Sequence, residues 1–343
     1  MWTTVVLDWL QDFLERRAAT PIQADLLALA VEEARDQVAN QPAGLVAGEL
    51  PGLTYLAAGG AGHPPLALAG CCLCIYLGAD VLDNVADREL SPRWAAHGPA
   101  QATLTGSTLL AAFALDALGE LEASVPVRAV VERALAGALI EMSAGQADDL
   151  ASEGRDDVTL DACEGILLGK SGAQAAFFAR AGAIVAGASV DVYEAYARFG
   201  RSLGAAGQLA SDCGDLFSDD GEVSRDLAAG KRTLPIVYAL AVLPPHGRET
   251  LLGHLDAAPA DPNRAGAARQ MMLDAGALQY GALRVEVYRA RALAALDTAK
   301  PLGHVAPTLQ RLAAATSLLR PGASLPDATE DTPRPANRDG PSP

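Results

Sequence analysis

Two groups of acidic residues are spaced so that a helix would present each group on one side. Asp80, Asp83 and Asp87 follow one another at intervals of three and four residues, which places their carboxylates on a single helical face. Neighbouring carboxylates repel, and their pKa values rise unless cations lie between them. Mg²⁺ prefers hard oxygen ligands and completes its shell with water and substrate phosphate. This group therefore predicts a magnesium site, with an exposed acidic helix face as the alternative.

The second group has the same spacing on a later segment. Gln208, Ser211, Asp212 and Asp215 follow a stretch of small apolar residues in GQLASDCGDL, so they too would share one helical face. Two such stripes on separate helices can face each other across a common space.

Basic residues accompany the acidic stripes. Lys170 lies in LLGKSGAQAAFFARAGA, and Lys231 and Arg232 lie in DLAAGKRTLPIVYAL, each ahead of an apolar helical segment. A diphosphate leaving group needs such cations, because its negative charge must be stabilised as its bond to carbon breaks.

Five short strings together carry a family resemblance, and their order along the chain adds weight that no single string has. The chain resembles the trans-isoprenyl diphosphate synthases, also called polyprenyl synthetases, over about residues 50–245. The five strings are DNVAD at 83–87, GQADDL at 145–150, KSGA at 170–173, QLASDCGD at 208–215 and DLAAGKRTLP at 226–235.

The resemblance implies an all-α isoprenoid synthase bundle around a deep apolar cavity, a homodimer, and three Mg²⁺ ions that bind an allylic isoprenoid diphosphate. It assigns metal ligation to the two acidic stripes, diphosphate binding to the basic residues, and the pocket near the carbocation to two glutamines. The metal ligands implied are Asp83, Asp87, Asp212 and Asp215, with Asp80 and Ser211 assisting, and the substrate-binding residues are Lys170, Lys231, Arg232, Gln146, Gln208 and Arg93.

The chain also departs from the family pattern. Asn84 and Ser211 stand where the family has Asp, so neutral oxygens replace two carboxylates. The family's basic element for isopentenyl diphosphate corresponds to GGAGHPP at 59–65, where His63 is the sole replacement, and one of two arginines after the first motif is Pro92, beside Arg93. Each missing charge-assisted contact costs about 1.5–3 kcal/mol.

These departures favour a terpene synthase, which ionises an allylic diphosphate and then cyclises or quenches the cation without a second prenyl unit. One alternative is a prenyltransferase that elongates with isopentenyl diphosphate or prenylates another acceptor. Another is a non-catalytic partner of such a synthase. A competing alignment, GDLFSDDGE at 214–222, nearly fits the metal motif of class I terpene synthases, but Gly214 stands at its first position.

Substrate length is predicted from the residues four and five positions before Asp83. Ala79 and Gly78 are both small, and they lie about one helical turn deeper at a rise of 1.5 Å per residue. Small residues leave room for a substrate of twenty carbons or more.

The rest of the chain predicts helices that position these groups. Alanine and leucine dominate and aromatic residues are 5% of the 343, a pattern typical of helices. We expect an amphipathic helix at the start, breaks at GELPGL, HPP, SPRW, VLPPHG and AAPADPNRAG, one domain over 1–319 and a disordered tail over 320–343. The further helices expected are about 22–40, 65–88, 100–119, 127–151, 159–186, 190–217, 230–243, 266–274, 276–297 and 304–319.

Charge and composition indicate which partners and which cellular location to expect. The formal net charge of −16 argues against nucleic acid, which is bound by clustered cations. The uncharged apolar run between Pro65 and Asp80 is shorter than the roughly 18 residues of a membrane span. Five cysteines without a secretory pattern favour a reduced cytoplasmic setting.

Overall fold

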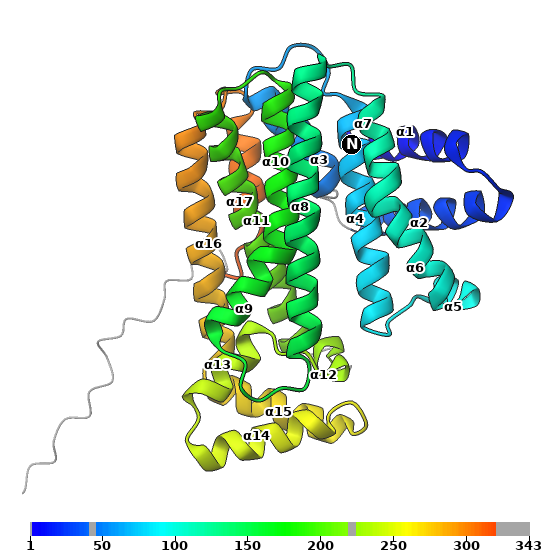
Figure 1. The fold of residues 1–343 in the computed structure, drawn as a ribbon. Coiled ribbons are helices and arrows are strands. Elements are labelled where there is room, and N and C mark those ends of the chain that lie inside the picture. Colours follow the sequence, from blue (N-terminus) through cyan, green and yellow to red (C-terminus); the bar gives the residue numbers. More distant parts are fainter. Residues whose placement is uncertain (1, 41–45, 219–223, 320–343) are drawn as a thin grey trace, which may run out of the picture.

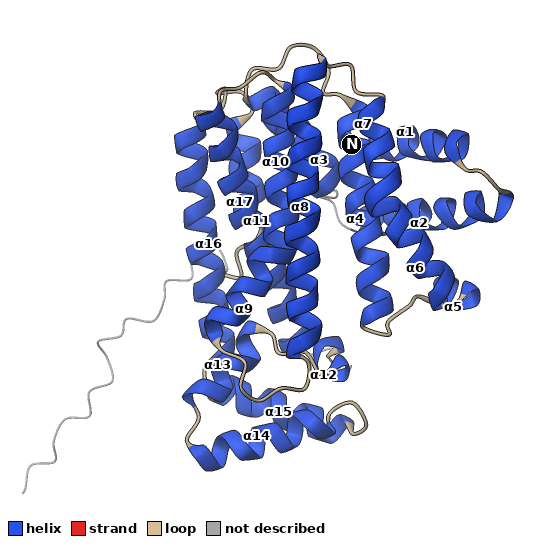
Figure 2. Cartoon of the chain, viewed as in Figure 1, coloured by secondary structure: helices blue, strands red, loops and turns tan. Residues whose placement is uncertain are grey.

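The computed structural model describes residues 2–40, 46–218 and 224–319, and every regular element in these ranges is a helix (Figure 2). The prediction of an all-α fold is therefore confirmed. The elements are α1 Trp2–Arg17, α2 Pro21–Asn40, α3 Val46–Ala57, α4 Leu66–Ala86, α5 Pro92–His97, α6 Pro99–Thr108, η1 Leu109–Phe113, α7 Ala114–Gly119, α8 Val125–Ser152, α9 Leu160–Leu167, η2 Leu168–Gly172, α10 Ala173–Val185, α11 Val190–Phe217, α12 Arg225–Ala229, α13 Leu234–Val242, α14 Pro245–Ala257, α15 Pro262–Asp274, α16 Ala277–Ala299 and α17 Ala306–Ala315.

Long helices form an upright bundle. Helix α11 packs along α10 and α16, and α10 also packs on α3 and α8 (Figure 1). Helix α10 is buried along most of its length and is rich in alanine, so its neighbours approach it closely. Helices α14 and α15 pack on each other and lie across one end of the bundle (Figure 1).

Helix α4 runs from an apolar interior to a polar end. Its residues from Ala67 to Gly78 are nearly all buried, because the run LALAGCCLCIYLG has no charged side chain to keep in water. Asp80 and Asp83 lie in the last two turns of the same helix and Asp87 is its C-terminal cap, at the margin of the core. The fold therefore places the carboxylates of α4 where an apolar interior meets solvent.

Several segments that were expected to be loops are helical. GELPGL, predicted as a break, lies inside α3, and Leu50 and Pro51 are buried there. Packing against α10 and α4 outweighs the local cost of proline. SPRW and VLPPHG begin α5 and α14, because proline is well suited to the first turn of a helix.

Two predicted helices contain wide turns. The segments 100–119 and 159–186 were expected to be continuous, but each holds a five-residue π-helical turn, η1 and η2. Such turns add a residue to the helical repeat and rotate the side chains that follow. The turn η2 contains Lys170, so it bears directly on the site described below.

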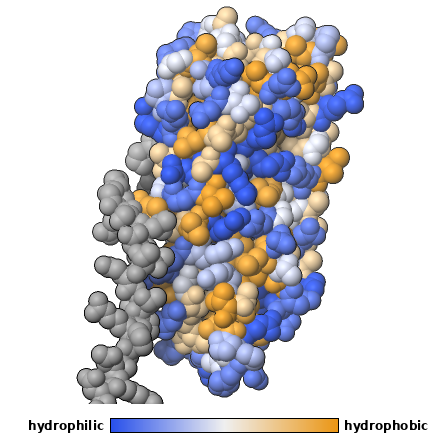
Figure 3. Space-filling view, turned by 90° about the vertical axis from the view of Figure 1, so that its left-hand side faces the viewer, coloured by the Kyte–Doolittle hydropathy of each residue, from blue (hydrophilic) through white to orange (hydrophobic). Residues whose placement is uncertain are grey.

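The surface and the chain ends complete the description. By length and composition, Leu66–Ala86 and Pro99–Gly119 would be long enough to cross a membrane, but 67% and 44% of their apolar windows are buried inside the protein. A buried core helix gives the same signal, so the absence of a membrane span stays a prediction. In the view of Figure 3, hydrophilic and hydrophobic side chains alternate in small patches. The predicted tail over 320–343 lies outside the described residues.

Candidate active site

A cavity of about 650 Å³ opens between α4, α8, η2, α11 and α12. Its volume is within the range of small-molecule sites. One side is polar and the other apolar, where α4, α8 and the η1 turn contribute side chains. The apolar walls include Leu82, Leu110, Leu139, Met142 and Leu150.

Lys170 reaches the cavity from the π-helical turn η2. A side chain at Gly145 would place its Cβ 2.8 Å from the backbone carbon of Gly169, so glycine at 145 lets α8 touch η2 directly. The Lys170 ammonium then donates to Asp149 Oδ2 at 2.5 Å and to Asp83 Oδ1 at 3.2 Å. One lysine therefore joins α8 to the acidic stripe of α4.

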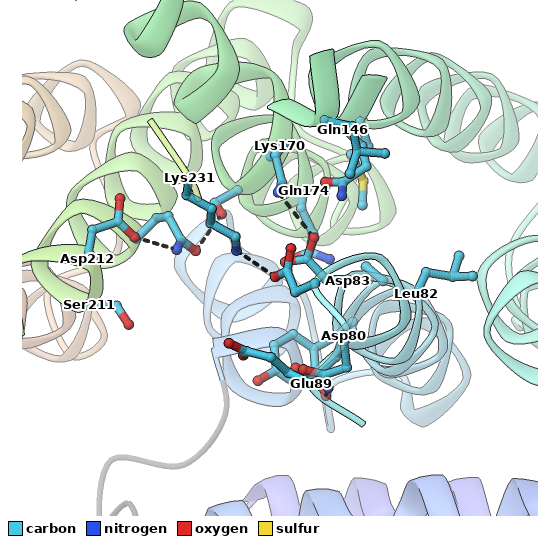
Figure 4. Close-up of a pocket in the computed structure, with 18 of the residues that line it drawn as sticks. Asp80, Leu82, Asp83, Glu89, Gln146, Lys170, Gln174, Ser211, Asp212 and Lys231 are labelled. Carbon is cyan, nitrogen blue, oxygen red and sulfur yellow. Dashed lines mark hydrogen bonds and ion pairs between the residues drawn. The ribbon is translucent and has the colours of Figure 1, made fainter. Parts of the chain in front are cut away.

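Lys231 makes a similar connection from the other side. It follows Gly230, which ends α12 in the left-handed conformation with φ 73°. Its ammonium donates to Asp87 Oδ2 at 2.5 Å and lies 3.9 Å from Asp226. In Figure 4 the Lys170 and Lys231 side chains extend into the space between Asp212 and the α4 carboxylates.

The second acidic stripe is held by a polar network on α11. Gln208 donates from Nε2 to Asp212 at 2.8 Å and accepts from the Ser171 hydroxyl at 3.0 Å. Asp215 accepts from the Ser224 hydroxyl and from the backbone N–H of Asp226 at 3.1 Å. Burial acts to raise the pKa of Asp215, but these hydrogen bonds from the start of α12 outweigh it and lower that pKa.

Three other carboxylates of the cavity have too little positive charge nearby to offset their burial, so their pKa values are raised. Burial, followed by repulsion from Asp83 and Glu33, raises the pKa of Asp80 from 3.8 to about 6. Burial also raises the pKa of Asp212, and burial together with repulsion from Asp212 raises that of Asp226. The cavity therefore favours the binding of a cation.

The donor set suits Mg²⁺. In the described part of the chain, no three His, Cys, Asp or Glu side chains converge closely enough to hold a metal, because Lys170 and Lys231 lie between the acidic stripes. Asp226 Oδ2 is nevertheless buried without a hydrogen-bond partner. Hard carboxylate oxygens beside an orphaned oxygen are the ligand type that Mg²⁺ prefers, so the residues present fit the ion.

The structure brings most of the predicted site residues together. The residues of both stripes line the cavity with the two lysines, the two predicted glutamines and one of the two length-determining positions. These lining residues are Asp80, Asp83, Asp87, Gln146, Lys170, Gln208, Ser211, Asp212, Asp215, Lys231 and Ala79. The competing motif at 214–222 runs into residues 219–222, which lie outside the described ranges.

Three predicted site residues lie elsewhere. A Cβ on Gly78 would lie 2.6 Å from the backbone nitrogen of Leu110, so Gly78 packs against the η1 turn and not into the cavity. Arg93 lies at the surface, 3.2 Å from Asp36 on α2. Arg232 is buried, and its guanidinium donates to the carbonyl of Arg155 at 2.6 Å, so it braces a loop and does not line the main cavity.

Four charged residues of the site were not predicted from the sequence. Asp149 pairs with Lys170, Glu89 lines the cavity after α4, and Arg225 and Asp226 line it at the start of α12. Asp149 and Asp226 belong to the strings GQADDL and DLAAGKRTLP, which drew attention for resemblance alone. Asp149 lies on α8 and Asp226 on α12. Spacing along the sequence therefore could not show that these two residues lie near the acidic stripes of α4 and α11.

Comparison with known proteins agrees with this geometry. The family model for polyprenyl synthetase matches residues 77–272, more than half of the chain. The chain belongs to the polyprenyl synthetase family. The predicted family is therefore confirmed. The matched range holds both acidic stripes and both cavity lysines.

Individual relatives are similar over part of their length. A farnesyl diphosphate synthase of Mycobacterium tuberculosis is 34% identical over 203 residues, which are 56% of either chain. A geranylgeranyl diphosphate synthase of that organism is 35% identical over 166 residues, 47% of either chain. The chain thus matches about half the length of these curated relatives.

Solved structures confirm the fold over nearly the whole chain. Geranylgeranyl pyrophosphate synthetase of Pyrococcus horikoshii has a TM-score of 0.77 at 21% identity and covers 92% of this chain and 96% of its own. A geranylgeranyl pyrophosphate synthase of Corynebacterium glutamicum, complexed with isoprenyl diphosphate and magnesium, has a TM-score of 0.76 at 22% identity, covering 93% and 99%. The isoprenoid synthase bundle predicted from the sequence is therefore correct.

Proposed function

We propose that this chain is a prenyltransferase that ionises an allylic isoprenoid diphosphate with Mg²⁺ and passes the prenyl group to a second molecule. One observation carries the proposal: the acidic stripes of α4 and α11 face one cavity, with Lys170 and Lys231 between them and apolar walls beside them. Similarity to diphosphate synthases over about half their length supports it.

The two acidic stripes supply the metal ligands in this proposal. Bound Mg²⁺ would supply positive charge that stabilises the leaving diphosphate. The number of ions, three by resemblance, stays a prediction. The ligands would be Asp83, Asp87, Asp212 and Asp215, with Asp80 and Ser211 assisting.

The two lysines hold the diphosphate. Lys170 and Lys231 each donate to a carboxylate. With those carboxylates holding Mg²⁺, the two ammonium groups would be available to donate to phosphate oxygens within the same cavity. These contacts strengthen as the carbon–oxygen bond breaks, because negative charge accumulates on the leaving group.

The apolar walls would hold the prenyl chain, and Gln146 and Gln208 line the same cavity, where the resemblance implies that they lie near the developing carbocation. Ala79 lines the cavity and Gly78 does not, so the prediction of a substrate of twenty carbons or more rests on Ala79 and the cavity volume. Ala79→Phe is expected to shift preference toward shorter substrates.

The test supplies geranyl, farnesyl and geranylgeranyl diphosphate together with the prenyl acceptor isopentenyl diphosphate, with Mg²⁺ or with excess EDTA, and records diphosphate release and the prenylated product. We expect both with Mg²⁺ and neither with EDTA, with the greatest release for the twenty-carbon substrate. Failure to release diphosphate from all three would contradict the proposal and favour the non-catalytic partner role.

Cyclisation, which the sequence analysis favoured, is the second candidate. The comparisons support prenyl transfer better, since the relatives bear the names of diphosphate synthases. One observation still favours cyclisation: Arg93, which the resemblance assigns to the second substrate, is paired with α2 at the surface. Hydrocarbon or alcohol products formed without any acceptor would identify a cyclase.

A homodimer is proposed as well. Apolar side chains on the outer sides of α6, α7 and α8 are exposed, as at Leu104, Leu115 and Ile140, and exposed apolar patches mark association surfaces. Sedimentation velocity tests this, and a monomer at micromolar concentration would contradict it. Cytoplasmic location stays a prediction.

A further inference from the structure

The π-helical turn η2, which carries Lys170, lies between α8 and α11 in direct backbone contact with both. On the α8 side, Gly145 approaches Gly169 closely, as described above. On the α11 side, a Cβ on Gly204 would collide with the carbonyl oxygen of Ser171. Glycine at these positions lets both helices touch the backbone of η2, so the place of the turn in the bundle is set by backbone packing.

The conformation of η2 determines where Lys170 points. A π-helical turn is rare, because its hydrogen bonds span five residues where an α-helix spans four. A return to the regular α-helix would shift the register by one residue and rotate the side chains by about 100°, since an α-helix has 3.6 residues per turn. Lys170 lies in the middle of Leu168–Gly172. Its contacts with Asp83 and Asp149 therefore depend on the wide turn.

Arg201 of α11 contacts both ends of this turn. Its Nη1 donates to the carbonyl oxygen of Leu168, the first residue of η2, at 3.2 Å. A Cβ on Gly172, the last residue, would lie 3.3 Å from Arg201 Cγ, so the arginine stem lies against that end. The same guanidinium donates to both carboxylate oxygens of Glu141 on α8, at 2.5 and 2.9 Å. This two-bond pairing fixes the plane of the guanidinium.

One side of α8 carries all the contacts with η2 and its support. Glu141, Gly145 and Asp149 follow one another at intervals of four residues, so they share a helical face. Glu141 orients Arg201, Gly145 admits the backbone of η2, and Asp149 pairs with Lys170. The support of the turn and the contact of its lysine are therefore built on the same helix.

The pair of Arg201 and Glu141 lies outside the cavity. Neither residue is among the cavity lining, and their side chains are 35% and 42% exposed. Ion pairs this exposed contribute little to global stability. The consequence of this pair is therefore local and falls on η2.

We propose that Arg201 is a positioning residue for diphosphate binding: it keeps η2 in the π-helical form and thereby holds Lys170 in the cavity. We rest this inference on the proposed function, in which Lys170 donates to the diphosphate. Arg201 acts only through Lys170, so its substitution weakens diphosphate binding without removing any side chain from the cavity lining.

Amide hydrogen exchange, followed by mass spectrometry without metal or substrate, tests the hold on the turn. We expect the peptide that contains η2 to exchange faster in Arg201→Met than in the unchanged protein. Arg180→Met is the matched control, because Arg180 and Glu194 form a similarly exposed pair between α10 and α11, at 2.6 Å and with 32% and 37% exposure. The control should leave exchange in η2 unchanged. Equal exchange in η2 in all three proteins would overturn the inference.

Titration calorimetry with inorganic diphosphate and Mg²⁺ tests the effect on binding. We expect Arg201→Met to bind about tenfold more weakly, as for a misplaced charge-assisted hydrogen bond, and Arg180→Met to bind as the unchanged protein does. Arg201→Lys keeps a donor for the Leu168 carbonyl but loses the two-bond pairing with Glu141, so it should recover part of the affinity. Unchanged affinity in Arg201→Met would overturn the inference and leave the proposed function intact.

A double-mutant cycle shows whether Arg201 acts through Lys170. Lys170→Met keeps Lys231 and the proposed metal ligands, and adding Arg201→Met to it should cause no further loss of diphosphate affinity. A loss of the same size with and without Lys170 would overturn the inference, because Arg201 would then support the site as a whole. Failure of the unchanged protein to bind inorganic diphosphate would contradict the proposed function and, with it, this role of Arg201.

Discussion

Two regions of this protein join basic to acidic side chains, and they differ in burial. At the cavity, Lys170 is 21% exposed, and Lys231 pairs with Asp87, whose side chain is 8% exposed. At the surface, Arg93 is 52% exposed and its partner Asp36 is 66% exposed. Both regions hold helices together with ion pairs, at 2.5 Å between Lys231 and Asp87 in the cavity and at 3.2 Å between Arg93 and Asp36 at the surface.

The difference in burial predicts that removing one member of an ion pair destabilises the protein more at the cavity than at the surface. Exposed pairs contribute about 0–1 kcal/mol, because water screens the charges and each free side chain is well solvated. Removing one member of a buried pair leaves the other charge without compensation, which costs about 3–5 kcal/mol. The cavity pairs are also positioned to exchange partners when metal and diphosphate bind. Four predictions test this contrast, from the largest effect to the smallest.

Asp83→Ala is expected to lower kcat for diphosphate release by about 10²–10³-fold, because it removes a proposed ligand of the Mg²⁺ that would stabilise the negative charge developing on the diphosphate. Steady-state kinetics with Mg²⁺ and the preferred allylic diphosphate measure it. Asp148→Ala is the control, since Asp148 is exposed and does not line the cavity. Substantial residual activity of Asp83→Ala would show that the metal site is misplaced.

Lys231→Met is expected to lower the free energy of unfolding by about 3 kcal/mol in the metal-free protein, because Asp87 loses its partner in a buried setting. Urea unfolding followed by circular dichroism measures the change. Lys300→Met, at an exposed position, is the matched control and should be close to neutral. Equal losses in the two variants would remove the distinction between buried and surface cations.

The pH dependence of stability should change when metal binds. The pKa of Asp80 is raised from 3.8 to about 6 in the folded protein, so the folded state binds its proton more tightly than the unfolded state. The contribution of Asp80 is therefore most favourable below about pH 4 and is lost as the pH rises to about 6. We expect Mg²⁺ to raise Tm more at pH 8 than at pH 5.

Thermal scans of the unchanged protein and of Asp80→Asn, with and without Mg²⁺, measure this effect. Without Mg²⁺, the Tm of the unchanged protein should fall between pH 5 and pH 6, and this fall should be smaller in Asp80→Asn. An identical pH dependence of Tm in both proteins would argue against a raised pKa of Asp80 in the folded protein.

Arg93→Ala is expected to change the free energy of unfolding by less than about 1 kcal/mol and to leave diphosphate release within about twofold of the unchanged protein. Chemical unfolding and steady-state kinetics measure these two quantities. A large loss of turnover would mean that Arg93 enters the cavity, as the sequence resemblance first implied.

Much of the fold was predictable because helical periodicity is a local property. The run that becomes α4 and the stripe at its end are readable from spacing alone, and so is the stripe on α11. GELPGL was misjudged, because burial against α10 and α4 decides the conformation around Pro51. Local proline chemistry is a weak guide where tertiary packing stabilises the helix.

The candidate site was partly predictable for the same reason. Gly78 and Ala79 are adjacent and similar in size, yet one packs on η1 and the other lines the cavity. Which neighbour faces which way depends on the rotation of α4 within the bundle. Arg93 and Arg232 were assigned by order along the chain, and their partners on α2 and in the loop at Arg155 lie 57 and 77 residues away along the chain.

The sequence by itself determined the family, the all-helical class and the two acidic stripes, since these depend on residue type and on spacings of three and four. Only the tertiary structure decided how the charges are matched. Lys170 meets Asp83 across 87 residues and Lys231 meets Asp87 across 144, while Arg93 turns to α2. Contacts between distant segments depend on how helices pack, and packing is a property of the whole core and not of any one helix.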